Sequence, residues 1–246
     1  LETAQCLVTA GAELEAKNSR GTTALMLAAQ KGHLAVAQFL ITAGAELNAK
    51  DDDGDTALMF AAMYGHVAVA QCLVTAGAEL EAKNLLGTAL MFAAQEGHLE
   101  TAQFLLTAGA ELEAKDDWYG KTALMLAAEK GHLETAQCLV TAGAELNAKA
   151  TGYYDGRTAL MFAKTNEHED IVKYLEEAIE DRAAKAGKEA ADNKAKLAAI
   201  EAKAAKDEKE AAEKEAAENK AKIAAIEATV DAQPAEEPGI AQVTAT

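Results

Sequence analysis

The feature that most constrains the fold of this chain is a sequence repeat with a period near 33 residues. The triplet Thr-Ala-Leu occurs five times, at steps of 33, 32, 34 and 36 residues: Thr23, Thr56, Thr88, Thr122 and Thr158. The tetrapeptide Gly-Ala-Glu-Leu also occurs five times, beginning at Gly11, Gly44, Gly77, Gly109 and Gly143. A sustained period of this length is typical of a solenoid, in which each unit buries its apolar face against its neighbours.

Each unit predicts two short helices and an extended connection. In the first full unit, the first helix begins at Thr-Ala-Leu, where the threonine hydroxyl can cap free backbone N–H groups, and it ends at Gly32. The second helix runs from His33 or Leu34 to Ala43. Gly44 then supplies the left-handed residue that ends this helix, and a polar turn leads to the next unit.

These units resemble the ankyrin repeat, whose 33-residue unit has a turn, two helices and a Thr-Pro-Leu-His-x-Ala signature. Here the signature is Thr-Ala-Leu-Met-[Leu/Phe]-Ala, while Ala-Ala-x-x-Gly-His at 28–33 and Leu-x-x-Ala-Gly-Ala-x-Leu-Asn-Ala at 40–49 fit the family well. The resemblance covers residues 1–182, as a half unit (1–17) and five full units. It implies an all-α ankyrin-repeat solenoid of helix–turn–helix units with extended turns. The half unit lacks a preceding helix. We therefore expect either that the sequence is a fragment of a longer array or that this end docks on another molecule.

The sequence after the array predicts one long helix, from Glu169 to Ala228. Ile179 stands where the fifth unit would need its terminating glycine, and no proline occurs before Pro234. Nine pairs of acidic and basic residues at i,i+4 spacing add about 0.2–0.5 kcal/mol each. We therefore predict three domains: the array (1–182), an extended charged helix rich in Ala, Glu and Lys (183–230), and a disordered C-terminus (231–246).

Large apolar side chains are sparse in the long helix. In the part of this helix that follows the array, residues 183–228, they are limited to Leu197, Ile200, Ile223 and Ile226. The two pairs are 26 residues apart, which places them about 80° out of register on a helix with 100° per residue. A long coiled coil is therefore not expected. We predict that the two pairs dock on partner proteins.

The turns between units carry the residues that distinguish one unit from another. We number the turns one to five: 18–22, 51–55, 84–87, 116–121 and 150–157. In proteins similar to this one, turn tips and the end of the first helix form a concave partner-binding face, and exposed aromatic residues there are typical of binding hot spots. The predicted partner-binding residues are Tyr64, Leu85, Leu86, Trp118, Tyr119, Tyr153 and Tyr154. The alternative is that the aromatic side chains pack locally on the longer turns.

The charge of the chain argues against several partner classes. The formal net charge is −17, and residues 1–150 hold 19 acidic and 9 basic side chains. Such a surface repels phosphate groups, so we expect neither nucleic acid nor a membrane as a partner. The sequence shows no transmembrane run and no signal segment at its start, and we predict a cytoplasmic protein that binds protein partners within a larger complex.

No pattern in the sequence predicts catalysis, a cofactor, a metal site or a small-molecule substrate. The five histidines occupy one repeat position, so they cannot converge on a metal, and we expect them to bond the turn between helices. Cys6, Cys72 and Cys138 alternate with Phe39 and Phe104, which predicts small buried side chains. The Asp51–Asp55 segment imitates a calcium loop but lacks its final glutamate.

The sequence therefore predicts a non-catalytic protein–protein interaction module that binds through its turn tips and concave face. The alternative is a structural subunit of a large assembly, for example of the cytoskeleton, with the long helix as tether or spacer. An enzyme regulated by these repeats would need a catalytic part outside this sequence.

Overall fold

The structure is a computed structural model that describes the backbone of residues 1–231. It describes the side chains of the same residues except 205, 207, 211, 212, 215, 216, 223 and 225–231. Two compact units are present: Leu1–Asp181, and a second unit that begins at Arg182. No helix among the described residues has the length and apolar character that crossing a membrane requires.

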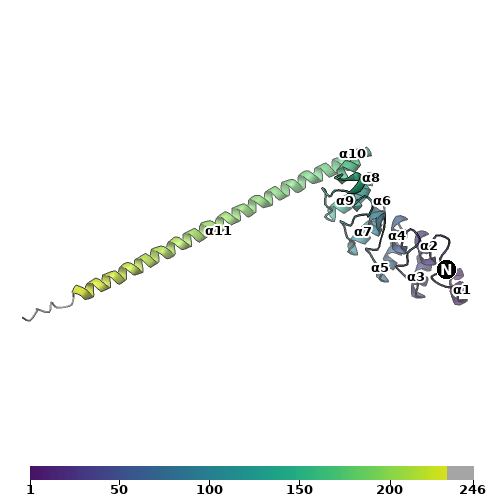
Figure 1. Cartoon of the computed structure of the whole chain (residues 1–246), viewed down its shortest axis with the longest axis horizontal. Helices are drawn as coiled ribbons and strands as arrows, with labels where there is room; N and C mark the ends of the chain where they lie inside the picture. Colours follow the sequence, from purple (N-terminus) through teal and green to yellow (C-terminus); the bar gives the residue numbers. More distant parts are fainter. Residues whose placement is uncertain (232–246) are drawn as a thin grey trace, which may run out of the picture. The chain divides into compact units, whose positions relative to one another are not determined.

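Most of the regular elements of the first unit are short helices joined by turns (Figure 1). In chain order these are α1 (Glu2–Thr9), α2 (Ala24–Gln30), α3 (Leu34–Thr42), α4 (Ala57–Met63), α5 (Val67–Thr75), α6 (Ala89–Gln95), α7 (Leu99–Thr107), α8 (Ala123–Lys130), α9 (Leu133–Thr141) and α10 (Ala159–Thr165). The turns add a two-stranded ladder, β1 (Lys83–Asn84) with β2 (Gly87–Thr88), and a 3-10 helix, η1 (Gly152–Tyr154). The long helix α11 is Glu169–Asp231.

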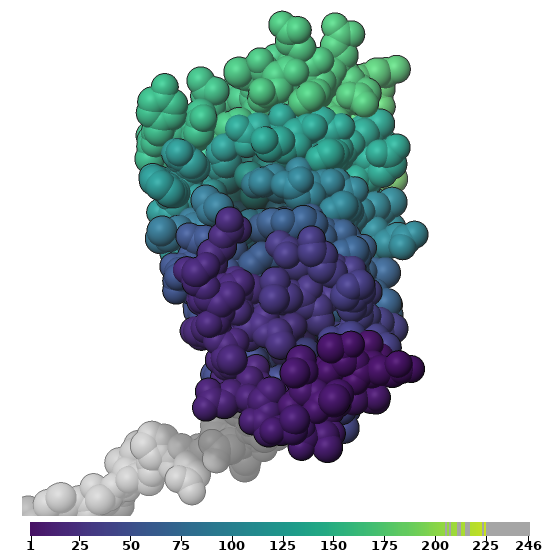
Figure 2. All heavy atoms as spheres, turned by 90° about the vertical axis from the view of Figure 1, so that its right-hand side faces the viewer, coloured from purple at the N-terminus to yellow at the C-terminus, as the bar shows by residue number. Residues whose placement is uncertain are grey.

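The helices form a stack of helix pairs, as the repeat predicts. The first helices pack in the order α2, α4, α6, α8, α10, and the second helices α3, α5, α7 and α9 pack beside one another in the same order. Figure 2 shows the units as successive bands of colour through the array. Alanine, leucine and methionine form the core between units, and Ala61, Ala62, Ala93 and Ala94 are fully buried. These small side chains allow the helices to approach closely.

The predicted helix ends are largely confirmed. The hydroxyls of Thr23, Thr56 and Thr158 accept the backbone N–H of the methionine three residues on, at 3.4 Å. Thr88 and Thr122 occupy the same position without such a bond. Glycines with φ between 94° and 107° follow all four second helices of full units: Gly44, Gly77, Gly109 and Gly143. The fifth unit has no such glycine, and its second helix continues as α11.

Four of the five histidines bond near the turn between two helices, as expected, but the turn belongs to the preceding unit. The Nε2 atoms of His66 and His98 lie 3.1 and 3.0 Å from the carbonyl oxygens of Gln30 and Met63 in the preceding unit. His132 and His168 repeat this contact. Each ring also packs against the glycine that follows the preceding first helix. The Gly-His pair of the sequence is therefore shared between two neighbouring units.

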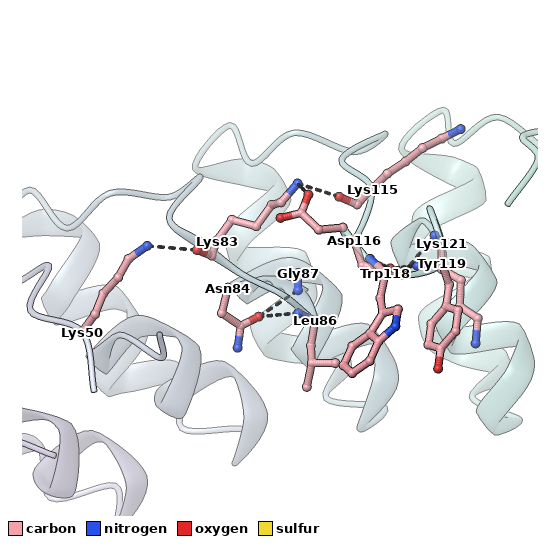
Figure 3. Close-up of polar contacts among 11 residues, drawn as sticks. Lys50, Lys83, Asn84, Leu86, Gly87, Lys115, Asp116, Trp118, Tyr119 and Lys121 are labelled. Atoms are coloured by element: carbon pink, nitrogen blue, oxygen red, sulfur yellow. Dashed lines mark hydrogen bonds and ion pairs between the residues drawn. The ribbon is translucent and has the colours of Figure 1, made fainter. Parts of the chain in front are cut away.

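A ladder of lysines also connects the units (Figure 3). The Nζ atom of each lysine donates to the carbonyl oxygen of the lysine one unit further on, at 2.8–3.0 Å, for Lys17, Lys50, Lys83 and Lys115. The last acceptor is Lys149. A second ladder runs in parallel, in which side-chain oxygens of Glu15, Asn48, Glu81 and Glu113 accept backbone N–H groups of the next unit. Each joint between units thus has its own set of polar contacts.

The predicted burial of the cysteines is wrong. Cys6 is exposed, and Cys72 and Cys138 are only half-buried. The two half-buried thiols line shallow grooves between neighbouring second helices, and partial burial raises the pKa of both. Alternation with phenylalanine indicated the correct apolar side of the helix, but that side is the outer edge of the array.

The described residues of the second unit carry fewer ion pairs than the sequence predicts. Lys206–Glu210 and Lys209–Glu213 form contacts of 3.7 and 3.9 Å. Both pairs are exposed, so each adds little to helix stability. The predicted disordered segment, 231–246, lies outside the described residues apart from the last residue of α11.

Candidate partner-binding surface

The predicted binding residues divide into two groups in the structure. Five side chains are exposed: Tyr64 (46%), Leu85 (61%), Leu86 (51%), Trp118 (61%) and Tyr153 (85%). Tyr119 and Tyr154 are half-buried. Tyr64 follows α4, and the other residues lie in turns three, four and five. The structure therefore brings exposed apolar groups to the turn side of four successive units.

Turn three is a tight hairpin that presents its two leucines to solvent. β1 and β2 pair antiparallel, with Lys83 opposite Thr88 and Asn84 opposite Gly87. The Oδ1 atom of Asn84 accepts the N–H groups of Leu86 and Gly87 at 2.8 and 2.9 Å. This turn is one residue shorter than turn two and two residues shorter than turn four, and the two leucines form its tip, where both are more than half exposed.

Turn four is organised by a buried carboxylate that sequence reasoning missed. Asp116 is 7% exposed, and its Oδ1 atom accepts the N–H groups of Trp118 and Tyr119. Its Oδ2 atom accepts the N–H of Lys121 at 3.0 Å. The sequence did contain a signal, because Asn18, Asp51, Asn84 and Asp116 all begin turns, and such side chains stabilise turns by bonding backbone N–H groups.

Lys121 is the second residue that sequence reasoning missed. It is 5% exposed, and its Nζ atom lies 2.7 Å from Glu129 Oε2. The same ammonium group lies 4.4 Å from the ring centroid of Tyr154, with the rings of Tyr119 and Phe162 at 5.2 and 4.8 Å. Ring faces attract cations, so turns four and five share one cation–aromatic cluster.

This cluster decides which aromatic side chains are free to bind. The ring centroid of Tyr154 lies 5.2 Å from that of Tyr119 and 5.3 Å from that of Phe162. Tyr119 and Tyr154 therefore pack within the turns themselves. Trp118 stacks on Tyr119 with a distance of 6.0 Å between ring centroids, and Tyr153 and Tyr154 make an edge-to-face contact with centroids 5.0 Å apart. Trp118 and Tyr153 thus lie on a packed base while remaining largely exposed. In Figure 3, Leu86, Trp118 and Tyr119 extend away from the lysine ladder.

A hollow of about 290 Å³ lies beside this surface, between turns one and two. Its apolar wall is formed by Leu27, Phe60 and Tyr64, and its polar lining includes Arg20, Asp51, Asp53 and Asp55. Burial raises the pKa of Asp55 to about 6, and the nearby charges of Asp51 and Asp53 add to the rise. The amide of Asn84 opposes it by donating to Asp55 Oδ1 at 2.6 Å. The carboxylates do not form a metal site: no group of three or more His, Cys, Asp or Glu side chains among the described residues could hold a metal ion.

The predicted docking residues of the second unit are only partly described. Leu197 and Ile200 are exposed, at 58% and 66%. The side chains of Ile223 and Ile226 lie outside the described residues. The first pair therefore remains a candidate contact for a partner.

Comparison with known families agrees with this architecture. A family model described as ankyrin repeats in three copies matches residues 1–84 and 80–150, and a single ankyrin-repeat model matches residues 155–179. These matches cover most of the chain, which belongs to the ankyrin-repeat family. Repeats of this family are generally protein–protein interaction modules. No curated protein matches the chain.

Proposed function

We propose that this protein is a non-catalytic interaction module that binds a partner protein through its turn tips and concave face. The observation that carries the proposal is the set of five exposed apolar side chains on the turn side of the array. Asn84 and Asp116 fix the turn backbones that carry Leu85, Leu86 and Trp118, so this part of the surface has little backbone freedom to lose on binding. Preorganised anchors of this kind bind with a smaller entropic cost.

The same surface supports the expected class of partner. Tryptophan, tyrosine and leucine side chains give an apolar centre, and the acidic turns around it disfavour nucleic acid and anionic membranes. The described residues offer no group suited to a metal. The proposal accordingly takes a protein, within a larger complex, as the partner, and the cytoplasm as its compartment.

A second candidate function is a structural subunit in which α11 serves as tether or spacer. It is favoured by the 63-residue length of α11 and by the exposed Leu197 and Ile200 in its described part. This function places the partner contact on the helix, whereas the leading proposal places it on the turns. The two make opposite predictions for matched variants.

Affinity capture with the full chain separates the two functions. One bait carries Leu86→Ser with Trp118→Ala in the turns, and a matched bait carries Leu197→Ser with Ile200→Ser in the helix. Each bait alters two exposed apolar side chains, so neither change should unfold the array. Partners that the turn variant loses and the helix variant retains support the leading proposal. Loss from the helix variant alone contradicts it and favours the tether.

A further inference from the structure

We propose that the partner segment places an arginine side chain in the hollow between turns one and two and apolar residues on Leu85 and Leu86. The inference rests on the proposed function and specifies the chemistry of the partner. Its basis is the continuity of two differently lined surfaces: an apolar tip at turn three, and beside it a hollow with an apolar wall and an acidic rim.

The two surfaces are joined by Asn84. Its Oδ1 atom holds the N–H groups of Leu86 and Gly87 in the tip of turn three, and its Nδ2 atom donates to Asp55 Oδ1 in the hollow at 2.6 Å. One side chain thus fixes both the leucine tip and the acidic rim. Helices of adjacent units lie about 8–10 Å apart, which an extended segment crosses in about three residues.

The charge of the hollow favours a cation. Three aspartates line it against one arginine, and none of these four side chains takes part in an ion pair within the described residues. Asp51 Oδ1 accepts two backbone N–H groups, those of Asp53 and Asp55, while its Oδ2 atom accepts no hydrogen bond in the described structure. The acidic rim therefore has carboxylate oxygens that can accept hydrogen bonds from a cationic side chain of the partner.

The shape of the hollow favours a long side chain over a small molecule or a metal. A volume of about 290 Å³ lies just below the range of about 300–1,000 Å³ for small-molecule pockets. Leu27, Phe60 and Tyr64 supply an apolar wall for the methylene groups of such a side chain, and the tyrosine ring offers a face for a planar cation. Arginine combines that planar stacking with a fork of donors that matches carboxylates, so we expect it to bind better than lysine.

Two synthetic peptides test the inference with the full chain: acetylated Arg-Ala-Ala-Leu-Leu and its reverse sequence, Leu-Leu-Ala-Ala-Arg. Matched peptides carry citrulline, which has nearly the shape of arginine without the charge. Binding is followed by NMR titration of backbone amides. We expect at least one arginine peptide to shift the amides of Asp53, Asp55 and Leu86 and to bind about fivefold or more tightly than its citrulline counterpart. Equal binding of all arginine and citrulline peptides would overturn the proposal.

Turn two provides a matched pair of variants. Asp53→Asn removes a carboxylate that lines the hollow, and Asp52→Asn removes an exposed carboxylate of the same turn that does not line it. We expect Asp53→Asn to weaken the arginine peptide by about fivefold and Asp52→Asn to leave it nearly unchanged. Equal losses would show general attraction to an acidic surface and would overturn the assignment.

The outcome also separates this inference from the proposed function. If the turn variant with Leu86→Ser and Trp118→Ala loses its captured partners while arginine and citrulline peptides bind equally, the array is an interaction module and the hollow is not its arginine site. If the arginine peptide selects the hollow while the turn variant keeps every partner, the hollow is a site and the proposed partner surface is wrong.

Discussion

The imidazole of His98 occupies the space in which a side chain at Gly65 would begin. A β-carbon on Gly65 would lie 2.6 Å from His98 Nδ1, and the same ring bonds the Met63 carbonyl at 3.0 Å. Gly65 also has a φ of 71°, in the left-handed region. The glycine of one unit and the histidine of the next therefore form a single joint, although they belong to different repeats.

This joint predicts that Gly65→Ala destabilises the array more than Gly77→Ala. Gly77 also has a positive φ, of 100°, but nothing lies within 4 Å of its β-carbon position. Gly77→Ala should cost only the left-handed strain, about 1–2 kcal/mol, whereas Gly65→Ala should add about 1–3 kcal/mol from crowding against His98. Chemical unfolding followed by circular dichroism measures both. Equal losses would mean that the ring moves aside freely.

Glu167 offers a stabilising substitution at the matching position of the fifth unit. It is the non-glycine residue with a positive φ among the described residues, at 61°, where the other units have glycine. Glu167→Gly should raise the free energy of unfolding by about 0.5–1 kcal/mol, because glycine adopts this conformation without strain. Glu167→Ala is the control, and a similar gain with alanine would attribute the effect to the lost charge.

Substitution of Tyr154 should lower the stability of the array much more than substitution of Tyr153. Tyr154→Ala removes the ring that contacts Tyr119, Phe162 and the Lys121 ammonium, and should cost about 2 kcal/mol or more. Tyr153→Ala removes a ring that is 85% exposed and should change stability by less than about 0.5 kcal/mol. Thermal unfolding of the two variants checks this. In capture experiments, Tyr153→Ala should lose partner binding while remaining folded.

The raised pKa of Asp55 predicts a pH-dependent stability. Its folded pKa of about 6 exceeds its value of 3.8 in the unfolded chain, so the folded state binds the proton more tightly. The contribution of Asp55 to stability should therefore fall as pH rises from about 4 to 6 and stay constant above. Asp55→Asn should stabilise the array by about 1 kcal/mol at pH 7.5, allowing for partial exposure, and by less at pH 4.5. Asp52→Asn serves as the control, and an equal gain there would contradict the assignment to Asp55.

The periodic part of the fold was predictable from sequence, and the departures from the period were less so. Gly44 and its equivalents predicted the helix ends, and Ile179 predicted the continuation into α11, because each depends on local backbone geometry. The burial of the cysteines was predicted wrongly because a repeat position indicates on which side of a helix a residue lies, but not how deeply its side chain is buried.

The candidate site was predictable only in outline. The seven predicted residues break the repeat, and the structure places six of them in turns three to five and Tyr64 directly after α4. Lys121 was missed because its partners, Tyr154 and Phe162, come from the next unit, and no period relates them to it. The hollow was missed for a similar reason, since it combines side chains of turns one and two with Leu27, Phe60 and Tyr64.

The lysine ladder gives the array a mechanical property. Every rung joins only two neighbouring units, from Lys17 to Lys50 and onward to Lys149. The rung at Lys83 is reinforced by Asp117, whose Oδ1 lies 2.5 Å from Lys83 Nζ. Load applied along the stack would therefore be carried by joints in series, each with its own stiffness. We expect the substitution of one lysine to weaken the contact at a single joint and to leave the helices on either side unaltered.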